Sequence, residues 1–207
     1  MRINRLFYTR AFRTFSKGFF KENTVCCQLL GLCSVLAVSN KCENALAMGL
    51  GVIFVLIISS LIVSSLRRFI PIQYRIITYM IIISSLVIFV DQYLKAYFPE
   101  ISKQLGPYVA LIITNCIIMG RQEAFAVRNP LRYSLYDALG NGLSYTYSLL
   151  IIASVREVLA FGTFFNIQVV PQGFDKWIVM AMAPGAFFLL AIYIWIFRRI
   201  ARLQPEK

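Results

Sequence analysis

The sequence contains no histidine and few charged residues, and both absences narrow the functions open to it. Of its 207 residues 14% are charged, against about a quarter in a soluble domain, while 59% are apolar. The lack of histidine excludes a His-based zinc site, His-held haem and a Ser-His-Asp triad. No Gly-x-Gly-x-x-Gly or Walker A sequence is present, so we expect no independent enzymatic activity. The composition predicts an all-α polytopic membrane protein.

Acidic residues are also scarce, with 9 against 21 basic residues and a net charge of +12. In a membrane chain such an excess is typical of cytoplasmic loops that face anionic headgroups, and we expect no nucleic-acid partner. Residues 1–22 hold six basic residues and one acid, and apolar and basic side chains each recur every four residues. This pattern predicts a basic amphipathic helix at the membrane surface. A cleaved signal peptide is the alternative.

Six apolar segments follow, over residues 25–38, 44–66, 76–97, 107–120, 138–155 and 177–197. Six crossings put both termini on one side of the membrane. That side then carries 16 of the 21 basic residues, and the other side carries 5. The positive-inside rule therefore predicts a single membrane domain (1–207) with six transmembrane segments and both termini cytoplasmic.

The first segment of each half is short. Residues 25–38 and 107–120 are 14 residues each, or about 21 Å of helix against a hydrocarbon core of about 30 Å. The halves, 25–97 and 106–198, also carry matching residues in one order: Cys33, Gly49 and Arg67, then Cys116, Gly140 and Arg156. These features predict an inverted 3+3 repeat whose first segments are short or broken at mid-membrane.

Two cysteines lie near the middle of these short segments, Cys33 in the first and Cys116 in the second. Because the segments enter from opposite faces, we expect the two thiols to meet, with Gly31 and Gly120 permitting close backbone approach. Thiols without histidine favour a soft metal, and two more thiolates from a similar protein would complete a four-thiolate [2Fe–2S] site. A transporter with two packing cysteines is the alternative.

Other polar residues have plainer interpretations. Asp91 and Lys95 are four residues apart and predict a structural ion pair on one helix face. We expect the remaining cysteines to be packing or surface residues: Cys26, Cys27 and Cys42. We interpret two charged pairs as interfacial anchors: Arg121–Glu123 and Arg156–Glu157. Polar residues flank the candidate ligands and either donate to sulfur or satisfy backbone groups at the helix breaks: Ser34, Thr114 and Asn115.

The strings around the two cysteines, residues 28–38 and 112–126, resemble the first-segment signatures of six-helix membrane proteins of ion-pumping redox complexes. Residues 84–92 and 101–105 are similar to the D-subunit family of the sodium-translocating NADH:quinone oxidoreductase (the NqrD/RnfE family). The sibling branch, the E subunit of the Rnf ferredoxin:NAD oxidoreductase complex, shares both cysteine motifs. The resemblance runs from about Gln28 to Thr163 and weakens in 1–22 and around 165–175.

This resemblance implies a place in a bacterial inner-membrane complex with the A, B, C, E and F subunits. It also implies that the chain pairs with the E subunit in inverted orientation and that each gives two cysteines, here Cys33 and Cys116, to an intramembrane [2Fe–2S] cluster. Electrons from NADH pass through FAD and another [2Fe–2S] cluster in the F subunit. They continue through this cluster and the flavins, FMN and riboflavin, of the C and B subunits to ubiquinone, while sodium is exported. The Rnf sibling, a non-redox transporter and a purely anchoring protein are the alternatives.

Overall fold

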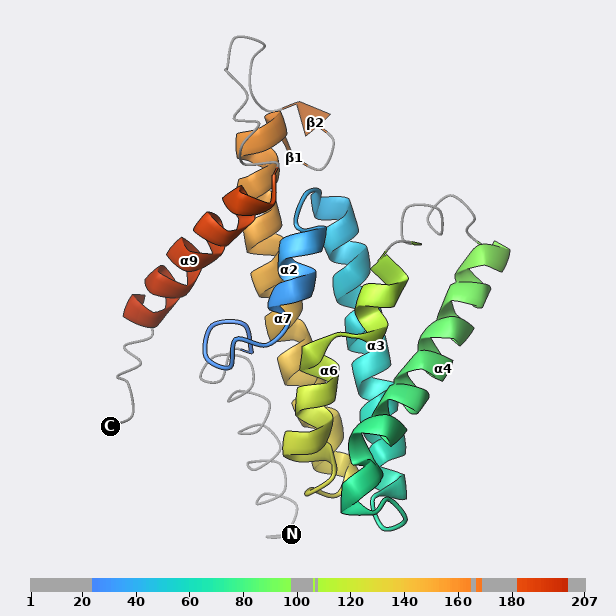
Figure 1. Ribbon diagram of the computed structural model, residues 1–207. Coiled ribbons are helices and arrows are strands. Elements are labelled where there is room, and N and C mark those ends of the chain that lie inside the picture. The colour runs from blue at the N-terminus through green and yellow to red at the C-terminus, as the bar shows by residue number, and fades with distance from the viewer. Residues whose placement is uncertain (1–23, 98–105, 107, 165–166, 169–181, 201–207) are drawn as a thin grey trace, which may run out of the picture.

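The computed structural model of the chain describes residues 24–97, 106, 108–164, 167–168 and 182–200 (Figure 1). The predicted amphipathic helix at 1–22 and the first residues of the predicted sixth segment lie outside the described residues. The described elements are α2 (Leu32–Val38), α3 (Cys42–Leu66), η2 (Ile72–Tyr74), α4 (Arg75–Tyr97), α6 (Cys116–Arg121), the π-helical turn η3 (Gln122–Ala126), α7 (Leu131–Phe161), β1 (Thr163–Phe164), β2 (Ile167–Gln168) and α9 (Ala183–Ile200).

The predicted multi-pass helical membrane fold is confirmed. Within the described residues four helices are long and apolar enough to cross a membrane: Cys42–Leu66, Ile72–Tyr97, Tyr108–Ala126 and Leu131–Ala160. A small departure from the all-α prediction follows α7, where β1 and β2 pair antiparallel with Thr163 opposite Gln168. This two-residue ladder turns the chain directly after the Gly162 cap, which has the left-handed φ of 69°.

Helices α3 and α7 form an antiparallel pair at the centre of the molecule (Figure 1). Their contacts run in opposite directions along the two helices, as three pairs show: Cys42 with Glu157, Gly49 with Thr146, and Ile53 with Gly142. The approach is close because the glycines leave room for the facing side chains. A Cβ on Gly49 would lie 2.5 Å from Thr146 Cγ2. Gly49 and Gly142, one from each half, therefore lie in the packing surface of this pair.

Both cysteine-containing segments are interrupted. Residues 24–31 form a series of turns before the seven-residue helix α2. In the second half, the helix that includes 108–113 stops at Thr114 and Asn115 and resumes as α6. This agrees with the expectation of short or broken first segments.

Two predicted boundaries were wrong. The segment expected to end at Gly120 continues through η3 to Ala126, and α7 extends beyond the expected 138–155 at both ends. In each case the predicted C-terminal end came directly before a charged residue, Arg121 or Arg156, that is in fact buried.

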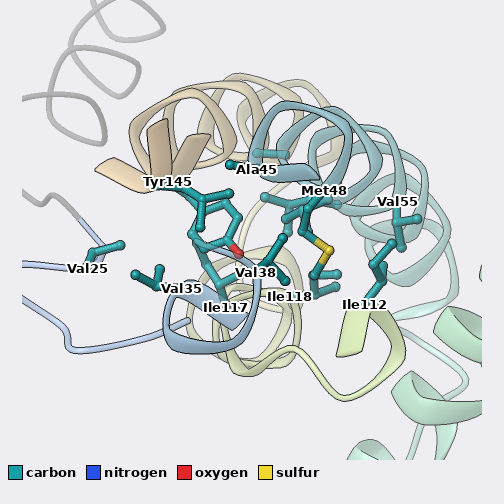
Figure 2. Packing of buried hydrophobic residues seen from close by; sticks show 14 of the residues in the cluster. Val25, Val35, Val38, Ala45, Met48, Val55, Ile112, Ile117, Ile118 and Tyr145 are labelled. Atoms are coloured by element: carbon teal, nitrogen blue, oxygen red, sulfur yellow. The ribbon is translucent and has the colours of Figure 1, made fainter. Parts of the chain in front are cut away.

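The hydrophobic core lies between the central pair and the two broken segments (Figure 2). Its members come from all four elements: Val35 and Val38 of α2, Met48 and Val55 of α3, Ile117 and Ile118 of α6, and Tyr145 of α7. Helix α4 lies at the periphery of the protein. Of its apolar span 17% is buried inside the protein, compared with 44% for α3 and 50% for α7. The broken segments are thus held against the best-packed part of the protein.

Candidate functional site

The structure brings Cys33 and Cys116 together, as predicted. The backbone N–H of Gly31 donates to Cys116 Sγ at 2.8 Å, across 85 residues of sequence. The Cys33 thiol is close enough to Cys116 Sγ to interact with it directly. Cys33 is exposed at the protein surface, and Cys116 is half-buried beneath it. The two thiols form a pair with one open side.

Glycine makes this approach possible at two positions. Gly31 has a φ of 81°, in the left-handed region that favours glycine, and a Cβ there would lie 2.9 Å from Tyr145 Cε2. On the second segment, a Cβ on Gly120 would lie 2.9 Å from Leu30 Cδ1. The predicted role of both glycines in close approach is therefore confirmed.

The polar residues beside the cysteines form hydrogen bonds with backbone groups at the helix breaks. Asn115 caps α6, because its Oδ1 accepts the N–H of Ile117 at 3.3 Å. Thr114 donates to Ala110 O at 3.1 Å, and Ser34 donates to Gly31 O at 2.9 Å. The sequence left two alternatives for these side chains: they donate to sulfur, or they form hydrogen bonds with backbone groups at the helix breaks. In the structure they form hydrogen bonds with backbone groups. The hydrogen bond to Cys116 Sγ comes from a backbone amide.

Tyr145 is a residue of this site that sequence reasoning missed. Its side chain is fully buried and points from α7 toward Val35 and Ile117 (Figure 2). The hydroxyl lies 2.6 Å from Ser34 Oγ, and the ring lies against Gly31. A signal was present in the sequence, since Asn141, Tyr145 and Ser148 form a polar stripe at helical spacing within an apolar span.

The interpretation of Arg121 as an interfacial anchor was wrong. Its guanidinium is buried and pairs with both carboxylate oxygens of Asp137 on α7. Asn141 donates to Asp137 Oδ1 at 3.0 Å, and Thr24 donates to Asn141 Oδ1 at 3.4 Å. This buried network joins α6, α7 and the start of the first segment. Glu123, the other member of the predicted anchor, is partly exposed and accepts from Arg75 at 3.5 Å.

Arg156 and Glu157 are likewise buried inside the protein, so their side chains do not anchor in the surrounding lipid. The Arg156 guanidinium donates to Leu36 O, Ser39 Oγ and Met182 O at 3.2, 2.8 and 3.1 Å. These acceptors lie in and just after α2 and just before α9. The Glu157 carboxylate accepts the N–H of Cys42 at 2.8 Å, at the start of α3. Arg156 therefore fixes the end of α2, the helix whose first turn carries Cys33, and Glu157 fixes the start of α3.

The plainer predictions hold. Lys95 Nζ lies 2.6 Å from Asp91 Oδ2, in the expected pair on the surface of α4. Cys26 and Cys42 are fully buried, as packing residues are, and Cys27 is half-buried.

Within the part of the chain that the structure describes, no group of three or more Cys, Asp or Glu side chains is arranged to hold a metal ion. A metal at Cys33 and Cys116 therefore needs ligands from elsewhere.

Comparison with known proteins agrees with the resemblance of the sequence motifs. Residues 11–194 match the family described as "Rnf-Nqr subunit, membrane protein". A Photobacterium profundum protein, named as the D subunit of Na(+)-translocating NADH-quinone reductase, is 47% identical over 193 residues, covering 91% of this chain and 92% of that protein. Proteins of the same name from Tolumonas auensis and Yersinia pestis are each 43% identical, covering 91% and 94% of this chain and 89% and 96% of those proteins.

Proposed function

The chain belongs to the Rnf-Nqr family of membrane proteins, and on that premise we propose that it is the D subunit of a sodium-translocating NADH:ubiquinone reductase. In this proposal Cys33 and Cys116 hold one half of an intramembrane [2Fe–2S] cluster, and the E subunit holds the other half. The observation that carries it is the meeting of the two thiols, one from each broken segment, with a backbone N–H donated to Cys116 Sγ.

The residues present fit half of such a cluster. In a four-cysteine [2Fe–2S] centre each iron is bound by two thiolates, so the pair in this chain suits one iron. Cys33 is exposed, which leaves the pair accessible to two thiolates of a second protein. A cluster held there would supply one-electron transfer. The chain's own part is to bind iron through two sulfurs and to donate the Gly31 amide to one of them.

The depth of the pair supports a place in the middle of the membrane. Tyr145, which lies beside both cysteines, is 14 residues from the start of α7 and 16 from its end. At 1.5 Å per residue these separations are about 21 and 24 Å. A centre at this depth is buried from both aqueous phases and suits an electron relay between the two faces.

The antiparallel packing of α3 and α7 supports the inverted repeat. In an inverted repeat the second helix of one half runs opposite to that of the other, and the contacts of Gly49 and Gly142 have this direction. We therefore propose six spans in two repeats, 25–97 and 106–198, with both termini on the cytoplasmic side of a bacterial inner membrane. The proposed partners are the A, B, C, E and F subunits, which carry the flavins and the second cluster.

The decisive experiment measures iron and acid-labile sulfide in the purified complex. The wild type is compared with the Cys33→Ser/Cys116→Ser variant, and Cys27→Ser serves as a matched control outside the site. We expect the double variant to assemble, to lose about two irons per complex and to slow NADH-to-quinone electron transfer. The Cys27→Ser control should keep the iron content and the electron-transfer rate of the wild type. Unchanged iron and turnover in the double variant would overturn the cluster assignment and leave the transporter or anchoring alternative.

A further inference from the structure

Tyr145 contacts the loop that donates the hydrogen bond to sulfur. Its ring fills the space beside Gly31, where a Cβ would come within 2.9 Å of Cε2 and 3.2 Å of Cδ2. Gly31 itself donates its N–H to Cys116 Sγ at 2.8 Å. One buried aromatic ring therefore supports the residue whose amide reaches the second cysteine.

The hydroxyl of Tyr145 fixes the same loop through Ser34. Ser34 has a single hydroxyl proton and donates it to Gly31 O at 2.9 Å. Tyr145 must then donate in the 2.6 Å contact with Ser34 Oγ, which also accepts from Asn115 Nδ2 at 3.4 Å. With one donated and two accepted hydrogen bonds, the Ser34 hydroxyl is saturated. The Gly31 carbonyl, which lies in the peptide after the donating N–H, is thus tied to α7, and this fixes the position of Gly31 from that side.

We propose that Tyr145, whose ring packs against Gly31, is a positioning residue that holds the Gly31 amide on Cys116 Sγ through the hydrogen bond of its hydroxyl with Ser34. The positioning itself follows from this chain's own contacts. Its consequence for a bound cluster rests on the proposed function. Hydrogen bonds to ligand sulfurs stabilise negative charge on the cluster and raise its reduction potential. Tyr145 therefore acts on the potential through Gly31, without touching iron.

The test compares the Tyr145→Phe complex with wild type by amide hydrogen exchange of the peptide that carries Gly31. Phenylalanine keeps the ring and removes only the hydroxyl. We expect the Gly31 amide to exchange about fivefold faster, the factor that corresponds to one ordinary hydrogen bond. The matched control is Tyr147→Phe, two positions along α7, where the side chain is exposed and its replacement should leave this peptide unchanged.

A second readout uses the midpoint potential of the cluster, from a redox titration followed by electron paramagnetic resonance. We expect a lower potential in Tyr145→Phe, with the iron content unchanged, and no shift in Tyr147→Phe. A merely structural contribution of Tyr145 to stability would not move the potential of an intact, fully loaded complex.

Ser34→Ala removes the hydrogen bond between Tyr145 and Ser34 from the Ser34 side. If the Tyr145→Phe complex fails to assemble, exchange of the Gly31 amide in Ser34→Ala tests the proposal instead. The proposal is overturned if the Gly31 amide exchanges at the wild-type rate in the assembled variants. An unchanged midpoint potential would overturn its consequence for the cluster. A wild-type complex without iron at Cys33 and Cys116 would refute the proposed function instead, and the exchange comparison would still decide the role of Tyr145.

Discussion

Replacement of Arg121 by Gln should strongly destabilise the protein, because the pair it forms with Asp137 is buried. The side chains of Arg121 and Asp137 are 7% and 6% exposed. An exposed pair contributes about 0–1 kcal/mol, whereas removing one partner of a buried pair costs about 3–5 kcal/mol, since the other charge loses its compensation. Arg121→Gln leaves the Asp137 carboxylate in an apolar interior without its guanidinium partner. We therefore expect Arg121→Gln to lower the free energy of unfolding by about 3–5 kcal/mol.

The assay is thermal unfolding of the detergent-purified complex, followed by size-exclusion chromatography after heating. A loss of about 3–5 kcal/mol corresponds to a midpoint lowered on the order of 10 °C for a chain of this size. Asp137→Asn should have a similar effect. The double variant removes both charges and should be less destabilised than the sum of the two single variants by about 2 kcal/mol or more. Arg68→Gln, at an exposed arginine, is the control and should leave the midpoint unchanged.

Additive effects of the two substitutions would refute this reasoning. Additivity would mean that the two charges do not compensate each other in the folded protein. A midpoint shift in Arg121→Gln no larger than that of the exposed control would refute it equally, because a guanidinium at the membrane surface would behave in that way.

Three further predictions concern the packing and capping of the helices, each measured by the same thermal midpoint. Gly49→Ala should cost about 1–3 kcal/mol, because its Cβ would meet Thr146 Cγ2 at 2.5 Å, and adding Thr146→Ala should recover most of the loss. No recovery would contradict the contact. Glu157→Gln should cost about 1 kcal/mol or more, because it weakens the hydrogen bond from the Cys42 amide, and a neutral result would count against that bond. Asn115→Ala should lose about 1 kcal/mol of N-cap stabilisation, while Asn115→Asp, which keeps an acceptor, should lose less.

The sequence predicted the thiol pair because the geometry of a membrane constrains short segments strongly. Two apolar runs of 14 residues predicted breaks near their cysteines, because such runs are too short to cross the hydrocarbon core as simple helices. The second run is in fact longer and reaches Ala126, yet it is broken at Thr114 and Asn115, directly before its cysteine. The glycines beside Cys33 and Cys116 added a second, local requirement for close approach. The apolar composition was enough to predict the helical membrane fold, and the position of each cysteine within its segment was enough to predict that the two thiols meet.

The sequence could not predict the buried partners, because these depend on which side chain faces which across two helices. Arg121 at the end of an apolar run resembles an interfacial residue until Asp137 of α7 is placed opposite it. Arg156 is similar, since two of its acceptors are carbonyl and hydroxyl oxygens more than 100 residues away, in α2 and just after it. Tyr145 belongs to the same class, as its importance rests on contacts with Gly31 and Ser34. A polar stripe on a helix indicates that partners exist, but it does not identify them.

The close contact between α3 and α7 has a consequence for the way the protein meets lipids of different thickness. At 25 and 31 residues these helices are about 38 and 46 Å long, both longer than a hydrocarbon core of about 30 Å. A single long helix relieves this hydrophobic mismatch by tilting alone. Here Gly49 is interlocked with Thr146 and Gly142 with Ile53, so neither helix slides or tilts without the other. The two helices must therefore tilt as one body, or the surrounding bilayer must thicken to match them.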